Sequence, residues 1–283
     1  MAFRNARKYF ITAKTDTTVN ELLSQHLDEG ALKALESGGV WLEKKRITDA
    51  IHPVIKGQTL IVYISATQHK TYRFSPSQIV EETDDWMVVD KPAGITTVAD
   101  RSHTQNNLSY GVGQYYKSLG NTYVPVAITR LDFMVNGLVL FPKHKQAEKD
   151  LFKLMADRKI GKYYVAKVEK IEKPATCLRI RDTVTFRDKA YIEDEGKIAH
   201  SLFILRDVSD TIVTYGVMIF TGRRHQIRLH ASRYLSPILG DSLYGGKVEL
   251  PGQALGLTAF GYNFFWKGKR YRIRKIYESL KII

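Results

Sequence analysis

The stretch YYVAKVEKI, residues 163–171, is rich in β-branched and aromatic side chains and is typical of a strand. Similar runs occur at residues 86–94 (WMVVDKPAG), 211–220 (TIVTYGVMIF) and 271–277 (YRIRKIY). Helical spacing interrupts them, most clearly at residues 145–159 (KQAEKDLFKLMADRK), where apolar residues recur on one side. Because the strands outnumber the helices and do not alternate regularly with them, the pattern favours an α+β fold over a doubly wound α/β sheet.

A smaller domain is predicted at residues 15–65, after an N-terminal tail at 1–14. Helical spacing at 18–27 (TVNELLSQHL) and 29–40 (EGALKALESGGV) predicts two helices, and the second is expected to stop at the Gly pair. The following segments predict a strand, a charged turn, a second strand and, after a Gly turn, a β-branched strand. Residues 66–78 lack periodicity and contain a Pro, which indicates a linker to a large domain at 79–283.

The chain carries 43 Lys and Arg residues against 29 Asp and Glu, a formal net charge of +14. Such an excess points to a polyanionic partner, with nucleic acid as the first candidate and an acidic membrane surface as the second. The basic N-terminal stretch has no apolar run after it and does not fit a secretory signal, and no apolar run reaches membrane-spanning length. We therefore expect a cytoplasmic protein that acts on nucleic acid without a membrane, and no protein partner is indicated.

A carboxylate stands in an apolar neighbourhood in the stretch ITRLDFMVNG, residues 128–137. Asp132 needs a cationic partner there, because a buried carboxylate is otherwise protonated or destabilising. Arg130 is two residues away, on the same face if the segment is a strand, and further cations lie in FTGRRHQIRLHAS, residues 220–232. An Asp held ionised by an Arg is a candidate nucleophile or base, and a buried salt bridge that only shapes the core is the alternative.

The common cofactor and metal motifs are absent from the sequence. The glycines of GDSLYGG (residues 240–246) do not have the spacing of a phosphate loop or a dinucleotide fingerprint. His225 and His230 do not have the spacing of a helical zinc pair. Cys177 is the only cysteine, which excludes a disulfide within the chain and a Cys-based zinc cluster. The pattern therefore indicates neither a cofactor nor a catalytic metal.

Five ordered blocks together resemble the RluA-type family of RNA pseudouridine synthases, which convert uridine in RNA to its C-glycoside isomer. The blocks are VVDKPAGITT (88–97), TRLDFMVNG (129–137), KYYVAKV (162–168), TGRRHQIRLH (221–230) and PILGDSLYGG (237–246). The resemblance implies the pseudouridine synthase fold, a mixed and largely antiparallel sheet with flanking helices and a central catalytic cleft. It also implies chemistry without a cofactor, because the isomerisation oxidises nothing and releases no group from the RNA.

The resemblance implies a catalytic set of Asp132, Tyr164 and Arg228. Asp132 would attack C1′ of the uridine or remove the C2′ proton, and Arg228 would hold the carboxylate ionised and fix its direction. Tyr164 would stack on the uracil and take part in removing the C5 proton, whereas Tyr163 would point to the opposite face of a strand. Leu229 would form an apolar wall of the uracil pocket.

The resemblance also implies a substrate-binding set. Arg130 would either fill the space that an everted uridine leaves in the RNA or bind a phosphate. The remaining predicted RNA contacts are Lys91, Arg223, Arg224, His225 and the basic residues around Lys44–Arg46, of which the Lys and Arg residues would meet phosphates.

Several positions depart from the family pattern. The departures are Thr129 for His, Val135 and Asn136 for Thr and Ser, Arg224 for Thr, and Thr258 for the His of an LHA triplet. Because the catalytic Asp, Tyr and Arg are kept, these changes concern the neighbours of the site more than its chemistry, and they weaken the transfer of a particular substrate.

The smaller domain resembles an S4-type RNA-binding module, with two helices, a GGVWLEKKRI turn and a KGQTLIVYI strand; an unrelated helical cap is the alternative. Several family members that act on large-subunit ribosomal RNA carry such a module. Large-subunit ribosomal RNA is therefore the expected substrate, with transfer RNA next.

Two other functions remain open from the sequence. The first is a non-catalytic RNA-binding factor of ribosome assembly on the same fold. The second is a glycoside or nucleoside hydrolase, which would need a second carboxylate. Asp241 is the only candidate for that role near the motifs, and its position in LGDSLYGG is more typical of a residue that closes a turn.

Overall fold

The computed structural model describes residues 6–27, 34–35, 38–65, 71–100, 103–250 and 254–276. The chain divides into two units, an N-terminal unit of Met1–Arg73 and Ala99–Gly111, and a large unit of Phe74–Val98 and Val112–Ile283. The sequence pattern gave no indication that Ala99–Gly111 groups with the N-terminal residues.

The N-terminal unit contains a four-stranded antiparallel sheet in the order β1-β6-β3-β4. Its elements are β1 (Ala6–Thr12), β2 (Thr17–Thr18), α1 (Val19–His26), β3 (Val40–Leu42), β4 (Lys45–Ile47), β5 (Pro53–Val54) and β6 (Thr59–Ser65). The short strands β2 and β5 pair with each other. A buried apolar cluster that includes Leu22, Leu23 and Val62 forms the core of this unit.

The first strand corrects the prediction of an N-terminal tail at residues 1–14. Ile11 is buried and Phe10 is exposed, so the side chains alternate as they do on a strand with one buried face. The pairing of β1 with β6 stabilises a segment whose charged residues hide the alternation in the sequence. The second predicted helix lies largely outside the described residues. Ala34 and Leu35 of that segment are described, and both are buried in the same cluster.

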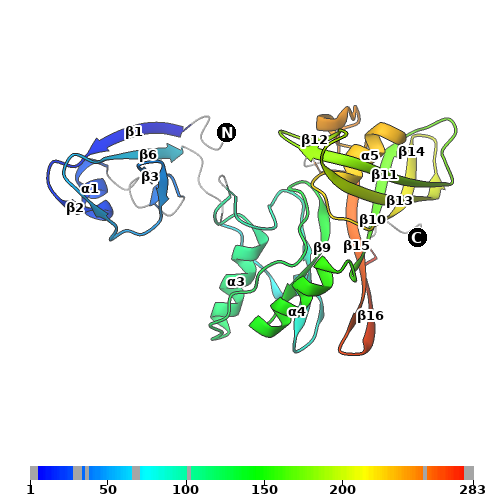
Figure 1. Cartoon of the computed structure of the whole chain (residues 1–283), viewed down its shortest axis with the longest axis horizontal. Coiled ribbons are helices and arrows are strands. Elements are labelled where there is room, and N and C mark those ends of the chain that lie inside the picture. Colours follow the sequence, from blue (N-terminus) through cyan, green and yellow to red (C-terminus); the bar gives the residue numbers. More distant parts are fainter. Residues whose placement is uncertain are drawn as a thin grey trace. The chain divides into compact units, whose positions relative to one another are not determined.

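The large unit is built on a ten-stranded sheet in the order β12-β11-β13-β14-β10-β15-β9-β8-β7, with β16 paired to β15 (Figure 1). Its strands are β7 (Ile79–Glu82), β8 (Trp86–Lys91), β9 (Asn136–Pro142), β10 (Gly161–Glu169), β11 (Cys177–Phe186), β12 (Ala190–Ile192), β13 (Lys197–Val208), β14 (Ile212–Ile219), β15 (Leu257–Trp266) and β16 (Lys269–Arg274). Within the described strands of this sheet, β9 and β15 run parallel and the other pairs are antiparallel. The predicted α+β fold with a largely antiparallel sheet is confirmed.

Helices α4 (Lys145–Ala156) and α5 (Gln226–Tyr234) accompany the two halves of this sheet, with the 3-10 turns η1 (Pro76–Gln78) and η2 (Ser242–Tyr244). Helix α3 (Leu108–Ser118) crosses the boundary between the two units, which follows Gly111. Helix α4 buries Ala147 and Leu151 against β9, and α5 lies beside β12 and β13 (Figure 1). Over the described residues, no helix has the length and apolar character that crossing a membrane requires.

The parallel contact between β9 and β15 depends on Gly137. This residue has a φ of +124°, and a Cβ built on it would lie 2.2 Å from the carbonyl oxygen of Ala259. Ala259 pairs with Gly137 on one side and with Tyr164 of β10 on the other. The absence of a side chain at Gly137 therefore lets the strand that follows the Asp132 loop lie directly beside β15.

Candidate active site

Asp132 lies in the loop that precedes β9 and not on a strand, so the strand-face argument for its pairing with Arg130 does not hold. Thr97 fixes this loop, because its hydroxyl accepts a hydrogen bond from the N–H of Leu131 at 2.9 Å and donates to the Leu131 carbonyl at 3.0 Å. The Asp132 side chain remains 26% exposed. The loop thus presents a carboxylate that is held in place and accessible from outside the protein.

Lys91 lies beneath the same loop. Its side chain is fully buried, and its ammonium donates to the carbonyls of Pro92, Ile95 and Phe133 at 2.9, 2.8 and 3.3 Å. Burial lowers the pKa of Lys91 to about 7, although the charges of Asp132 and Asp90 oppose the shift. The prediction that Lys91 meets an RNA phosphate is wrong for this structure, because the backbone around the Asp132 loop encloses the ammonium.

Arg228 of α5 joins two carboxylates. Its Nε and Nη2 donate to the two oxygens of Asp241 at 2.7 and 2.8 Å, and its Nη1 donates to Oδ2 of Asp132 at 3.3 Å. The Asp241 side chain has no exposed surface, and that of Arg228 is 10% exposed. A bidentate carboxylate fixes the plane of a guanidinium. Asp241 therefore orients Arg228 so that one N–H points at the partly exposed carboxylate of Asp132.

His225 lies at the N-cap of α5 in the left-handed conformation, with a φ of 57°. Its Nε2 is 3.7 Å from Oδ2 of Asp132, and its Nδ1 is 3.1 Å from the Tyr244 hydroxyl. Burial lowers the pKa of His225; the charge of Asp132 opposes this shift and that of Arg228 adds to it. The imidazole is therefore neutral at pH 7 and contributes a dipole, not a charge, beside Asp132.

Tyr164 is buried on β10, where burial raises its pKa and the neighbouring Tyr262 and Asp132 raise it further. A phenol in this environment keeps its proton at neutral pH. The pairing of β10 with β15 shifts register between Tyr163 and Tyr164, and the ring of Tyr163 lies 6.4 Å from that of Phe260. Such irregularities in strand pairing redirect side chains near active sites.

The other predicted RNA contacts lie around α5 and β11. Arg224 is exposed, with its guanidinium 3.9 Å from the centre of the Phe186 ring. Arg223 is half-buried and donates from Nε to the Ile198 carbonyl at 2.9 Å. Leu229 is buried in an apolar cluster against which Phe186 packs. The structure thus leaves the Arg224 side chain accessible and uses one donor of Arg223 internally.

Three of the five positions that depart from the family pattern form side-chain hydrogen bonds inside the protein. Thr129 contacts the hydroxyl of Tyr262 at 2.7 Å and accepts from the N–H of Leu140 at 3.1 Å. Thr258 donates to the side chain of Asn136 at 3.0 Å, across the parallel strands β15 and β9. The replacements at Asn136 and Thr258 thus complement each other directly.

The family model of RNA pseudouridylate synthase matches residues 85–233, which is more than half of the chain. The chain belongs to the RNA pseudouridylate synthase family. An uncharacterized RNA pseudouridine synthase of Aquifex aeolicus is 26% identical over 251 residues, which cover 82% of this chain and 79% of that protein. Ribosomal large subunit pseudouridine synthase D of Xanthomonas campestris is 26% identical over 242 residues, covering 83% and 72% of the two chains.

The fold agrees with that assignment. The structure of human RNA Pseudouridylate Synthase Domain Containing 4 superposes with a TM-score of 0.58 at 19% identity, covering 72% of this chain and 90% of that chain. The RluA-type pseudouridine synthase fold that the sequence blocks implied is therefore confirmed. The family model and the relatives show that the chain is an RNA pseudouridine synthase. The S4-type assignment of the N-terminal unit stays a prediction.

The contact of Asp241 with Arg228 was not predicted from the sequence. Asp241 did close a turn, as expected, because its carbonyl accepts from the N–H groups of Tyr244 and Gly246 at 3.1 and 2.8 Å. Its carboxylate, however, lies on Arg228, 13 residues away in the sequence. A buried Arg requires a carboxylate partner, and Asp241 of the nearby GDSLYGG block was a candidate for that partner beside Asp132.

Proposed function

We propose that this enzyme isomerises specific uridines in structured RNA, with large-subunit ribosomal RNA as the preferred substrate and Asp132 as the catalytic carboxylate. The arrangement of Arg228 between a buried Asp241 and a partly exposed Asp132 supports the proposal. One carboxylate serves to hold the guanidinium, and the other is left accessible to substrate. A pair that only shaped the core would have no reason to leave its second carboxylate exposed.

The chemistry needs a single anionic group at the ribose. Breaking the N1–C1′ bond and joining C5 to C1′ moves the base on the same sugar; C5 loses its proton and N1 takes up a proton, so the composition is unchanged. Asp132 either attacks C1′ or removes the C2′ proton to begin an elimination, and it is the central group on both routes. Arg228 donates a hydrogen bond to the carboxylate, and a fixed donor of this kind loses no energy in reorganising during the reaction.

The uracil is expected to stack on Tyr164. A stacked uridine in RNA cannot reach Asp132, so it is flipped out of the RNA at a cost of a few kcal/mol. The raised pKa of Tyr164 keeps its phenol protonated, which favours a stacking role over that of a base for the C5 proton. Arg130 is exposed two residues before Asp132, and it would fill the vacated space or bind a phosphate.

The proposed substrate rests on two observations. A relative from Xanthomonas campestris is named as a ribosomal large subunit pseudouridine synthase and covers most of this chain. The N-terminal unit carries the charged hairpin β3–β4, whose turn residues Glu43 and Lys44 have positive φ and which exposes Lys44 and Lys45. An S4-type module with this hairpin would bring a second RNA contact, and transfer RNA is the second candidate substrate.

The test compares wild type with Asp132→Asn and Asp132→Ala. Each protein is incubated with ribosomal RNA and transfer RNA from cells that lack the gene, and pseudouridines are mapped at single positions. Wild type is expected to modify defined positions of large-subunit RNA, and both variants are expected to bind RNA without forming product. Product from Asp132→Ala would refute the role of Asp132, modification of transfer RNA alone would refute the substrate, and free uracil would indicate hydrolysis.

A further inference from the structure

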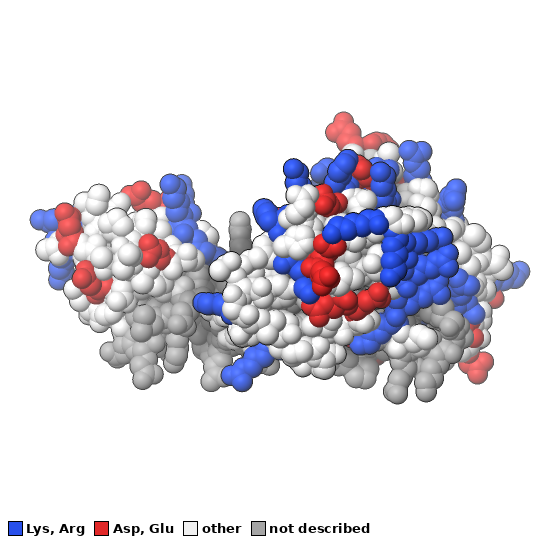
Figure 2. Space-filling view, turned by 90° about the horizontal axis from the view of Figure 1, so that it is seen from below, with Lys and Arg blue, Asp and Glu red and all other residues white. Residues whose placement is uncertain are grey.

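The hairpin of β15 and β16 is the most basic segment of the large unit. Residues 266–275 read WKGKRYRIRK, in which six of ten residues are Lys or Arg. Neither the sequence motifs nor the candidate active site makes use of these cations. In the view of Figure 2, Lys and Arg side chains gather on one face of the large unit beside a group of Asp and Glu.

Alternation along β16 separates its side chains into two sets. Tyr271 and Ile273 face the core, where Tyr271 lies 4.9 Å from the Trp86 ring and Ile273 is buried. Arg270, Arg272 and Arg274 lie on the opposite face and are exposed. Because a strand rises about 3.4 Å per residue, the three Arg residues follow each other at intervals of about 7 Å. The apolar set holds the strand, and the basic set forms a regular row.

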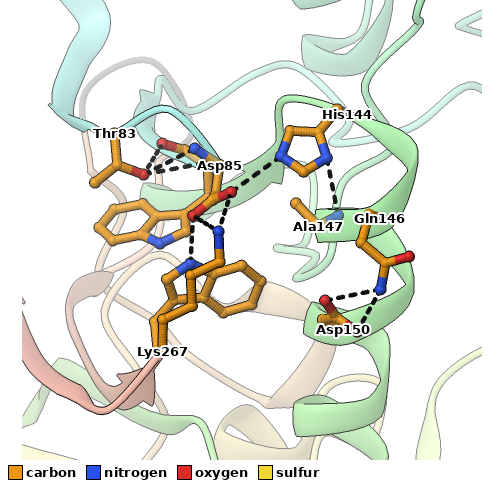
Figure 3. Close-up of polar contacts among 9 residues, drawn as sticks. Thr83, Asp85, His144, Gln146, Ala147, Asp150 and Lys267 are labelled. Carbon is orange, nitrogen blue, oxygen red and sulfur yellow. Dashed lines mark hydrogen bonds and ion pairs between the residues drawn. The ribbon is translucent and has the colours of Figure 1, made fainter.

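The turn of the hairpin is fixed to the rest of the unit by Asp85 (Figure 3). The Asp85 carboxylate accepts from Nε1 of Trp266 at 2.7 Å, from Nζ of Lys267 at 2.9 Å and from Nε2 of His144 at 3.0 Å. The bonds from Lys267 and Trp266 are the largest causes that lower the pKa of Asp85 to about 2. The carboxylate therefore stays ionised at physiological pH, and it joins the turns of two hairpins to the start of α4.

Four cations of the hairpin have no acidic partner among the residues that the structure describes. Lys267 and Lys275 pair with Asp85 and Asp90. Within the described part of the chain, no carboxylate lies at salt-bridge distance from the other four, which are Lys269, Arg270, Arg272 and Arg274. On the exposed face of α4 and at its C-terminal end, by contrast, Lys145 pairs with Glu148 and Lys153 with Asp157. Among the described residues, the hairpin thus concentrates positive charge that no carboxylate neutralises at salt-bridge distance.

An exposed aromatic ring accompanies the row. Phe265 is 60% exposed and pairs across the strands with Arg270, whose guanidinium lies 5.9 Å from the ring centre. The same Arg270 donates from Nε to Asn263 at 3.1 Å. Cations interleaved with an exposed aromatic side chain are typical of surfaces that bind the backbone and bases of nucleic acid.

The hairpin also continues directly from the candidate active site. Thr258 and Ala259 at the start of β15 pair with Asn136 and Gly137, which follow the Asp132 loop. The strand then runs away from α5 to the turn at the far end of the sheet (Figure 1). The seven residue steps from Ala259 to Trp266 span roughly 23 Å, so β15 leads from beside the site to the turn of the hairpin. The basic row on β16 lies alongside this part of β15, with Arg274 nearest to the site.

We propose that the exposed face of the hairpin, formed by Lys269, Arg270, Arg272, Arg274 and Phe265, binds the phosphate backbone of the RNA that flanks the target uridine. This inference rests on the proposed function in that the bound polyanion is the RNA substrate. The hairpin positions the substrate without reading its bases, because phosphate contacts set register and orientation. Fixing the turn through Asp85 lets the row bind without first being ordered.

The test replaces three charges at once. Arg270→Gln/Arg272→Gln/Arg274→Gln is made in the Asp132→Asn background, so that binding is measured without turnover. The matched control is Lys145→Gln/Lys149→Gln/Lys153→Gln on α4, which removes the same number of charges. The dissociation constant for a fluorescent large-subunit RNA fragment is measured over a salt series.

Losing three phosphate contacts is expected to lower the slope of log affinity against log salt by about 2. When the salt is raised from about 50 to 200 mM, the factor by which affinity falls would therefore be about twentyfold smaller for the hairpin variant than for its parent. The α4 control is expected to keep the parent slope. Arg→Lys at the same three positions is expected to restore the slope. In the active background, the Gln variant should raise KM and leave kcat on saturating RNA unchanged.

An unchanged slope in the hairpin variant, or an equal loss in the α4 control, would overturn the proposal. Loss of solubility with RNA affinity intact would also overturn it, since charges on an edge strand then serve only to prevent aggregation. Loss of binding to anionic phospholipid vesicles but not to RNA would do the same. Because affinity is measured in the Asp132→Asn protein, a wild type that forms no pseudouridine would refute the proposed function and leave this result standing.

Discussion

Replacement of Asp241 by Asn tests the central contact of the candidate active site. The two side chains have nearly the same shape, so the change removes the charge without leaving a cavity. An amide offers one acceptor oxygen, whereas Arg228 donates to both oxygens of Asp241 at 2.7 and 2.8 Å. One of the two bonds is therefore lost, and an N–H group of Asn faces an N–H group of the guanidinium.

The magnitude follows from the burial of the pair. Asp241 has no exposed surface, and breaking a buried ion pair by removing one partner costs about 3–5 kcal/mol. Since Asn retains one hydrogen bond, we expect the free energy of unfolding to fall by about 3 kcal/mol, at the lower end of that range. The freed guanidinium is expected to move toward Asp132, and a displacement of about 1 Å in a catalytic constellation reduces the rate about 100-fold.

The assay follows the C5 proton. RNA made with uridine tritiated at C5 releases tritium as pseudouridine forms, and kcat and KM are obtained from the release at several RNA concentrations. Urea denaturation at pH 7 gives the free energy of unfolding of the same preparation. Asp241→Asn is expected to lower kcat about 100-fold with little change in KM, because it alters the orientation of Arg228 and not the RNA contacts.

Asp182→Asn is the matched control. Asp182 also faces α5, where it accepts a hydrogen bond from the Tyr234 hydroxyl at 2.9 Å, and its side chain is 14% exposed. This variant is expected to keep the wild-type kcat. If Asp241→Asn loses stability but keeps its kcat, the contact with Arg228 is structural alone and the positioning role is refuted. If neither quantity changes, the bidentate contact itself is wrong.

Three further predictions concern the frame around the site. Gly137→Ala is expected to destabilise the protein by more than 2 kcal/mol, about twice the cost of a typical point mutation, because its Cβ would meet the Ala259 carbonyl at 2.2 Å; a thermal melt within 2 °C of wild type would contradict this. Thr129→Val removes the contact to Tyr262 and leaves a buried N–H unpaired, so urea denaturation should show a loss of about 1–3 kcal/mol, with no loss as the contrary result. Burial lowers the pKa of Lys91 to about 7 from 10.5, so between these pH values the unfolded chain holds a proton on Lys91 that the folded chain has lost. The free energy of unfolding should therefore rise as the pH rises from 7 to 10. Urea titrations of Lys91→Met should lack that rise, and a pH dependence equal to that of wild type would refute the prediction.

The sequence alone determined the family and the class of reaction. Five blocks in a fixed order identified an RNA pseudouridine synthase, because the catalytic residues of such an enzyme must stand in specific local contexts. The net charge of +14 indicated a polyanionic partner for a similar reason, since charge is a property of composition and needs no fold. Strands such as β10 and β14 were also predictable, because their β-branched runs are local signals.

Only the tertiary structure decided which groups the charged side chains near the site contact. Asp241 was expected to close a turn, and the fold brings its carboxylate onto Arg228. Lys91 was expected to meet a phosphate, and the fold encloses its ammonium among three carbonyls. Both outcomes depend on burial and on contacts between distant segments, and a basic or acidic residue looks the same in the sequence whether it faces water or the core.

The row of Arg residues on β16 shows the same division of information. Its alternation of basic and apolar residues is present in the letters YRIRK, yet the sequence does not say which strands it joins. Pairing with β15 and the bonds of Asp85 to the turn place that row beside a strand that begins next to the Asp132 loop. Residue types determine what a surface can bind. The pairing of distant strands determines where that surface lies, and it cannot be read from local composition because its hydrogen bonds join backbone groups of segments far apart in the sequence.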